Sequence, residues 1–136
     1  MRVFLDANII FSAAQAGSAT RELLEGVHRY GELVTNLHAW TEALRNLARK
    51  RPSLVPGLEE LREIIGFSNA FQPIKDIDLP QEDIPILAGA IGSRCTHLWT
   101  SDKRHFGKWY GRTVGKVTIV SSPMLADLVM ELGWEP

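Results

Sequence analysis

Short apolar segments alternate with longer segments of helical periodicity along the whole chain, and this alternation constrains the fold more than any other feature. Each apolar segment has the length of a buried strand, and each intervening segment has room for a crossover helix. The predicted strands are residues 3–5, 32–35, 71–74, 97–100 and 117–120. Strands separated by helices form parallel sheets with right-handed crossovers. The expected fold class is therefore α/β, with three α/β/α layers and a central parallel sheet of about five strands.

Helix signals occupy the segments between these strands. Apolar residues recur at helical spacing there, and capping residues or breakers mark the ends, as with the N-cap Asn36 and the helix-stopping Pro52. Residues 102–115 form a glycine-punctuated loop with room for one helical turn. The expected helices cover residues 7–14, 18–30, 54–65, 84–91 and 122–132, and one more runs between Asn36 and Pro52.

The size and composition of the chain suit one folding unit. A chain of 136 residues with 45% apolar content can bury a core of its own, so we expect a single domain, residues 1–136. The one cysteine, Cys95, has no partner for an intrachain disulfide, and Asp6 interrupts the N-terminal apolar run before a signal-peptide core builds up. The apolar stretch 86–91 is too short to cross a bilayer. These features favour a reducing, cytoplasmic setting without a membrane.

Four carboxylates lie at positions that a parallel sheet brings to one of its edges. Asp6 directly follows the first predicted strand, Asp102 follows the fourth, and Glu42 and Asp83 lie on helices between them. Ligands of such sheets bind beyond the carboxyl ends of the strands, so we expect these acids to converge. Each acid also has a simpler explanation, because Asp is a common helix N-cap and Glu is favoured in the first turn of a helix.

Convergence of the four acids has an electrostatic consequence. At an effective dielectric of about 20 and a separation of about 5 Å, each pair of like charges costs roughly 3 kcal/mol. A close quartet must therefore bind a cation or take up protons. Carboxylates are hard oxygen ligands of the kind that Mg²⁺ and Mn²⁺ accept, which favours metal-assisted phosphodiester chemistry.

The basic residues are distributed in a way that suits a phosphate-bearing substrate. The net charge of −1 gives the whole molecule no attraction for nucleic acid, but nine of the fifteen Lys and Arg residues lie in two runs that follow Glu42 and Asp102. Such runs can hold phosphates beside an acidic pocket, or they can be ordinary solvated faces. The runs are Arg45, Arg49, Lys50 and Arg51, then Lys103, Arg104, Lys108, Arg112 and Lys116.

The ordered set of acids resembles the PIN-domain ribonuclease family over nearly the full chain. That family pattern is a hydrophobic strand ending in Asp, a mid-chain Glu on a helix, an Asp heading a helix of small residues, and a strand closing on Thr-x-Asp. The corresponding segments here are Phe4-Leu5-Asp6-Ala7-Asn8, Glu42, Asp83 before Ile86-Leu87-Ala88-Gly89-Ala90, and Thr100-Ser101-Asp102. Ala7 departs from the pattern, since a hydroxyl residue is frequent there, and Glu82 beside Asp83 leaves the third acid slightly ambiguous. Asp83 is favoured, because its separation from Asp102 and from the small-residue run fits the pattern better.

The resemblance implies an activity and a set of roles. It implies a Mg²⁺- or Mn²⁺-dependent endoribonuclease that cleaves single-stranded RNA through metal-activated water, as in VapC-like toxins of toxin–antitoxin pairs. Asp6, Glu42, Asp83 and Asp102 would be the metal ligands and catalytic residues. Asn8, Thr100 and Ser101 would support these acids by hydrogen bonds, and Arg45, Arg49, Lys103 and Arg104 would bind RNA.

The same resemblance implies protein partners. A small antitoxin would cover the acidic cleft. A homodimer is also expected, because the terminal helix carries more apolar surface than one side needs; core packing is the equal alternative. The apolar residues of that helix are Met124, Leu125, Leu128, Val129 and Leu132.

Histidines and aromatic residues give weaker signals. His38 and Glu42 are one helical turn apart, but no third ligand clusters with them, and His28, His97 and His105 show no ligand spacing. Three aromatic residues interleave with the second basic run and suit stacking on unpaired bases, although covering the sheet edge or a subunit contact is the preferred explanation for the last two. They are Phe106, Trp109 and Tyr110.

Two other classes of function are compatible with parts of this pattern. A catalytically silent PIN-like module would bind RNA or a protein, but a scaffold has no reason to keep mutually repelling carboxylates. A receiver-like signalling domain has a similar length, but it needs an acidic pair near the first strand, and Asp6 is followed by Ala7 and Asn8.

Overall fold

The structure is a computed structural model that describes all residues 1–136 of the chain. A six-stranded sheet with the order β3-β2-β1-β4-β6-β5 forms its centre, and every neighbouring pair is parallel except β5 with β6. This arrangement confirms the predicted α/β class. The strands are β1 (Arg2–Leu5), β2 (Glu32–Thr35), β3 (Ile65–Phe67), β4 (His97–Trp99), β5 (Thr113–Val114) and β6 (Val117–Val120).

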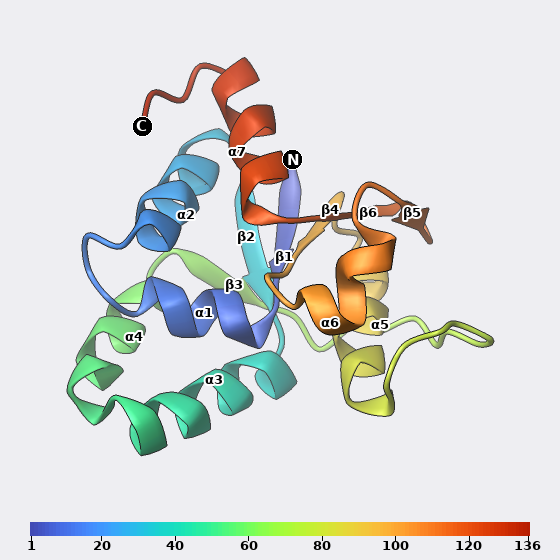
Figure 1. Cartoon of the computed structure of the whole chain (residues 1–136), viewed down its shortest axis with the longest axis horizontal. Helices are drawn as coiled ribbons and strands as arrows, with labels where there is room; N and C mark the ends of the chain where they lie inside the picture. Colours follow the sequence, from blue (N-terminus) through green and yellow to red (C-terminus); the bar gives the residue numbers. More distant parts are fainter.

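Helices cover both faces of this sheet. Figure 1 shows α1 to α4 gathered on one side and α5 and α6 on the other. None of the helices combines the length and apolar character that crossing a bilayer requires. The α-helices are α1 (Ala7–Ala13), α2 (Ala19–Tyr30), α3 (Leu37–Lys50), α4 (Val55–Leu61), α5 (Ile84–Gly92), α6 (Lys103–Phe106) and α7 (Ser122–Glu131), and the short 3-10 helices are η1 (Pro52–Leu54), η2 (Gln81–Asp83) and η3 (Gly107–Trp109).

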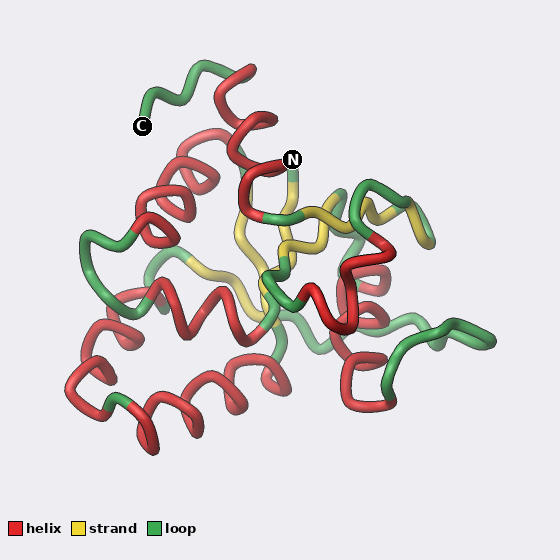
Figure 2. The backbone as a smooth tube through the Cα atoms, viewed as in Figure 1, coloured by secondary structure: helices red, strands yellow, loops and turns green.

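The third strand differs from its prediction. Residues 71–74 were expected to form it, but β3 is Ile65–Phe67, which pairs with β2 in parallel register from Leu33 opposite Ile65. The predicted 54–65 helix therefore ends early, with α4 stopping at Leu61. Residues 71–74 instead belong to the long loop visible in Figure 2. Pro73 lacks an N–H for a strand ladder, and Phe71 is 68% exposed, so this segment meets neither requirement of a buried strand.

The end of the predicted 102–115 loop forms an additional strand. β5 pairs with β6 as an antiparallel hairpin, with Val114 opposite Val117. Gly115 and Lys116 connect them with φ values of +54° and +71°. Two consecutive positive φ angles match the turn that suits the twist of a two-residue hairpin. The sheet therefore has six strands rather than about five.

The strand order reverses between β1 and β4. The chain runs from β1 outward to β2 and β3, and then returns to place β4 on the other side of β1. Such a switch point leaves a crevice at the carboxyl ends of the two central strands, because the following helices diverge to opposite faces. Asp6 follows β1 at this point, and Thr100 follows β4.

Gly57 allows α4 to pack closely against the end of α1. A Cβ atom at this position would overlap the carbonyl oxygen of Ala14, which is backbone and cannot rotate away. Gly107 offers a matched control, because its backbone is right-handed helical (φ −54°, ψ −41°) and the nearest atom to a new Cβ is Lys103 Cβ at 3.9 Å.

We therefore expect Gly57→Ala to lower the free energy of unfolding by about 1–3 kcal/mol through overpacking. Gly107→Ala is expected to be neutral or to stabilise the protein by up to about 1 kcal/mol, because alanine restricts the unfolded chain. Urea titrations of the two variants and the wild type measure this difference. Equal effects of the two substitutions would contradict the close packing at Gly57.

Candidate active site

Hydrogen bonds join the ends of β1 and β4 directly. Asp6 N–H donates to the carbonyl of Trp99 at 3.1 Å, which places the Asp6 side chain beside Thr100. The Asp6 carboxylate then accepts three bonds, from Ala7 N–H at 2.7 Å, Thr100 Oγ1 at 2.7 Å and Asn8 Nδ2 at 3.1 Å. Asp6 is only 4% exposed. Its carboxylate is therefore both the N-cap of α1 and the buried centre of the crevice.

The predicted supporting residues complete this network. Asn8 Oδ1 accepts from Ser101 N–H at 3.0 Å, and Thr100 Oγ1 accepts from Asp102 N–H at 3.1 Å. These bonds fix the course of the chain after β4. Ser101 takes part through its backbone, while its side chain is exposed.

Two helices bring the remaining acids to the same crevice. Asn36 caps α3 by accepting from Ala39 N–H at 2.9 Å, and its Nδ2 donates to the carbonyl of Pro85 at 3.2 Å. The start of α3 is thereby tied to the start of α5. Glu42 lies on α3 at the rim, and Asp83 is buried immediately before α5.

All four predicted carboxylates line one pocket of about 240 Å³. Glu82 does not line it; its exposed side chain borders a neighbouring hollow with Glu42 and Arg45. The geometry therefore favours Asp83 over Glu82 as the third acid. Besides the four acids, the pocket wall contains Ala7, Asn8, Phe11, Ser12, Asn46 and Lys50.

Burial changes the acidity of the two innermost carboxyls. Desolvation raises the pKa of Asp6 from 3.8 to about 6, against the opposing effect of the bonds from Thr100 and Ala7 N–H, and the charges of Asp83 and Glu42 raise it further. Desolvation also raises the pKa of Asp83. His105 opposes this shift, and the charge of Asp102 adds to it. Both shifts have the direction expected of acids gathered in a poorly hydrated pocket.

His105 belongs to this cluster, although its sequence spacing gave no indication of a ligand role. Its Nδ1 lies 2.7 Å from Asp83 Oδ2 and 3.0 Å from Asp102 Oδ2. The structure thus places His105 against two of the acids, which the lack of ligand spacing among the histidines did not predict. The available signal was the i, i+3 spacing from Asp102, which places two side chains on one face when the loop after Asp102 turns helical.

The donor set fits a divalent cation. Asp83, Asp102 and His105 each offer a ligand atom, and these atoms lie within 4.8 Å of one another. Asp83 Oδ2 and His105 Nδ1 are both buried, and each has its polar contact within this cluster. Oxygen and nitrogen atoms that meet at one buried point in this way are consistent with a site for an ion.

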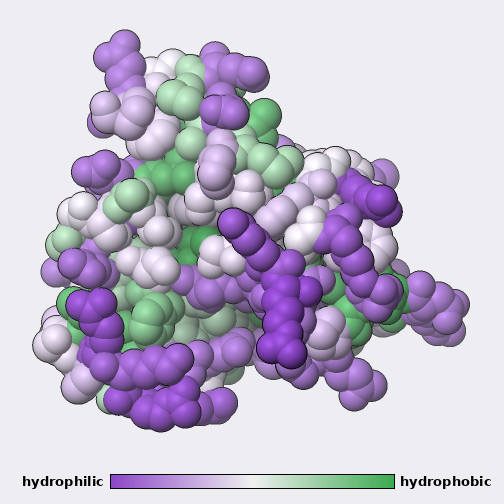
Figure 3. All heavy atoms as spheres, in the orientation of Figure 1, coloured by the Kyte–Doolittle hydropathy of each residue, from purple (hydrophilic) through white to green (hydrophobic).

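The predicted RNA-binding residues lie around the pocket rather than in it. Arg45 borders the hollow next to Glu42, and Arg49 donates to Asn46 Oδ1 at 3.3 Å on the exposed side of α3. Lys103 and Arg104 are exposed on α6. Lys50, from the same basic run as Arg45, lines the pocket itself. Figure 3 shows hydrophilic side chains gathered over α3 and α6 on this face.

The aromatic residues of the second basic run pack in or against the hydrophobic core. Phe106 is fully buried, so the prediction that it stacks on nucleotides is wrong. Tyr110 Oη donates to the carbonyl of Thr100 at 2.9 Å, and Trp109 Nε1 donates to the carbonyl of Asp78 at 3.3 Å. Both rings pack against the core, which agrees with the alternative that they cover the sheet edge.

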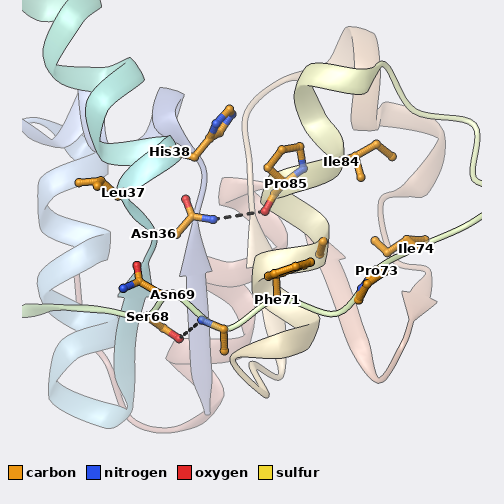
Figure 4. Close-up of a pocket in the computed structure, with 12 residues that line it drawn as sticks. Asn36, Leu37, His38, Ser68, Asn69, Phe71, Pro73, Ile74, Ile84 and Pro85 are labelled. Carbon is orange, nitrogen blue, oxygen red and sulfur yellow. Dashed lines mark hydrogen bonds between the residues drawn. The ribbon is translucent and has the colours of Figure 1, made fainter.

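A separate apolar hollow lies between the start of α3, the 68–74 loop and α5 (Figure 4). Leu37 and His38 approach it from α3, and Ile84 and Pro85 from the other side. Its wall contains no carboxylate. This hollow therefore lacks the oxygen ligands that a hard metal ion needs.

Comparison with solved structures defines the class of fold. A chain of the VapBC2 complex from Rickettsia felis, solved with a DNA fragment from its promoter, matches 89% of this chain and 98% of its own length with a TM-score of 0.66 and 14% identity. A chain of VapBC-1 from nontypeable Haemophilus influenzae matches 90% of this chain and 99% of its own length with a TM-score of 0.59 and 14% identity.

A third solved structure is similar over a smaller part of the chain. VapC20 from Mycobacterium tuberculosis, described as a sarcin-ricin loop cleaving toxin, matches 75% of this chain and 91% of its own length with a TM-score of 0.53 and 12% identity. No family model and no curated protein sequence matches the chain. The chain has the PIN-domain fold of the VapC toxins, which confirms the resemblance at the level of the fold.

The raised pKa of Asp6 predicts a pH dependence of stability. A carboxyl whose pKa is higher in the folded state binds its proton more tightly there, so its contribution to stability is present below about pH 4 and is lost as the pH rises to about 6. A shift of this size corresponds to a loss on the order of 3 kcal/mol. Asp6→Asn has no such proton to lose.

The wild type is therefore expected to lose stability relative to Asp6→Asn between pH 4.5 and pH 6.5. Urea unfolding of both proteins in EDTA across this range measures the difference. A difference that stays constant with pH would show that Asp6 ionises as it does in an unfolded chain.

Proposed function

We propose that this protein is a divalent-metal-dependent endoribonuclease of the PIN type, acting on single-stranded RNA. One observation carries the proposal: four carboxylates from distant parts of the sequence line one pocket at the switch point of the sheet. The similarity in fold to VapC20, a toxin described as cleaving the sarcin-ricin loop, supports it. We assign the activity to one nuclease domain, residues 1–136.

The four acids share one proposed task, and their neighbours keep them in place. Asp6, Glu42, Asp83 and Asp102 would hold Mg²⁺ or Mn²⁺, with Asp6 kept in place by Thr100 and Asn8. A bound ion of this kind supplies a water of lowered pKa and offsets negative charge on the scissile phosphate. Asn8 and Thr100 keep the acids oriented, so the site needs little rearrangement when substrate arrives.

The surroundings of the pocket suit an extended strand of nucleic acid. Glu42, Asn46 and Lys50 follow one another at helical spacing along α3, and all three line the pocket. Lys50 would bind a phosphate next to the acids, and Phe11 on α1 offers an apolar surface in the same wall. Arg45, Arg49, Lys103 and Arg104 would neutralise phosphates farther along the strand.

The direct test is RNA cleavage by the purified protein with Mg²⁺ or Mn²⁺. Asp6→Asn and Asp102→Asn are each expected to reduce the cleavage rate by at least about 100-fold, because each removes a metal-binding charge. Asp127→Asn, on the exposed surface of α7, is the matched control and is expected to cleave as the wild type does. Undiminished cleavage by folded Asp6→Asn would refute the proposal.

A catalytically silent RNA- or protein-binding module is the second candidate. The raised pKa values of Asp6 and Asp83 are compatible with this second candidate, because protonated acids can lie close together without a metal. Metal binding separates the two candidates. A ligand that binds only the folded state raises the melting temperature by mass action.

We expect Mn²⁺ at about 100 times its dissociation constant to stabilise the wild type by about 2.7 kcal/mol. Asp6→Asn is expected to respond much less, and Asp127→Asn to respond fully. Thermal melts in a Mn²⁺ series measure this. A wild-type melting temperature that does not change with Mn²⁺ concentration would favour the silent module.

We further propose the toxin role and the partners that it entails. The similar VapBC structures are toxin–antitoxin complexes, and a small antitoxin covering the acidic pocket would hold this chain inactive in the cytoplasm. A homodimer through α7 also stays a proposal. Leu125 and Val129 of that helix are buried in the core, while Leu132, just beyond its end, is 51% exposed. Co-purification with the product of a neighbouring reading frame tests the antitoxin.

A further inference from the structure

The imidazole of His105 lies between two of the four carboxylates. Its Nδ1 is 2.7 Å from Asp83 Oδ2 and 3.0 Å from Asp102 Oδ2. An ordinary interpretation is an ion pair or hydrogen bond that steadies the acids. One ligand atom each of Asp83, Asp102 and His105 lies within 4.8 Å of the other two, so the same contacts also suit a bound ion.

The local structure directs one carboxylate oxygen of Asp102, Oδ2, toward His105 Nδ1. Asp102 caps α6, and its Oδ1 accepts from His105 N–H at 3.1 Å. This bond fixes the carboxylate and turns Oδ2 toward the imidazole. The helical turn at the same time brings the His105 ring over Asp102, as an i, i+3 pair does.

The separations between these atoms match those of neighbouring ligands on one ion. Two donors bound at about 2.1 Å and at right angles to each other lie about 3 Å apart. His105 Nδ1 is within a few tenths of an ångström of that separation from both Asp83 Oδ2 and Asp102 Oδ2. Asp83 is 8% exposed, so a competing water has little access to its carboxylate.

We propose that His105 Nδ1 is a nitrogen ligand of the metal site and gives it a preference for divalent transition-metal ions over Mg²⁺. The inference rests on the metal site of the proposed nuclease and specifies its chemistry. Mg²⁺ prefers an all-oxygen, well-hydrated shell, whereas imidazole binds first-row transition ions more strongly in the order Mn²⁺, Fe²⁺, Co²⁺. A site that adds one imidazole to its carboxylates would therefore select such ions.

Calorimetric titration of the RNA-free protein with Co²⁺ and with Mg²⁺ tests the preference. His105→Asn replaces the imidazole with a smaller amide and is expected to weaken Co²⁺ binding by at least about 10-fold. Mg²⁺ binding is expected to change by less than about 3-fold. His28→Asn, on the exposed end of α2, is the matched control and is expected to bind both ions as the wild type does.

Two results of the titration would overturn the proposal. Equal weakening of Co²⁺ and Mg²⁺ in folded His105→Asn would make His105 a residue that only positions the acids. Unchanged or tighter binding of both ions would make it a cationic partner that competes with the metal.

A measurement on the wild type avoids dependence on the variant. Zn²⁺, which is diamagnetic, is expected to shift the ¹⁵N resonance of His105 Nδ1. The ring ¹⁵N resonances of His28, His38 and His97 are expected not to shift. Absence of a His105 shift under saturating Zn²⁺ would overturn the proposal. If ion selectivity depends on His105 but the protein cuts no RNA, the nuclease proposal is refuted and this inference stands. If the protein cuts RNA but His105 has no role in ion binding, this inference is refuted and the nuclease proposal stands.

Discussion

The buried carboxylate of Asp6 is the constraint on which the rest of the site depends. It accepts hydrogen bonds from Ala7, Asn8 and Thr100, and so it joins the end of β1, the start of α1 and the end of β4. Removing a charge from water is costly, and these three donors lower that cost without removing it. The same bonds that hold the strand ends together thus leave an acid whose ionisation strains the fold.

A cost of this kind is typical of functional sites. Natural proteins depart from local rules of stability mainly at functional sites, and a set of converging acids is such a departure. The pocket offers two ways to relieve the repulsion, protonation of Asp6 and Asp83 or contact with His105, and a bound cation would be a third. A site that is unfavourable when empty gains more from an ion than a site already satisfied, because binding also removes the repulsion.

Much of the fold and part of the site could be predicted from local patterns. Strand and helix periodicity predicted the α/β class, and the resemblance carried by the acids agrees with the observed fold. The failures lie where local signals compete. Residues 71–74 are apolar enough for a strand, but the parallel partner of β2 is Ile65–Phe67. Phe106 lies within a basic run, which favoured stacking on nucleotides, yet this last residue of α6 is fully buried in the core.

The sequence by itself determined which residues are acidic, where the apolar periodicity changes and which residues cap helices, because these properties depend on residues close together in the chain. Only the tertiary structure decided that Lys50 lines the pocket and that His105 contacts two of its acids. These outcomes depend on how α3, α5 and α6 are oriented around the switch point. That orientation is set by contacts between segments far apart in sequence, which a local pattern does not encode.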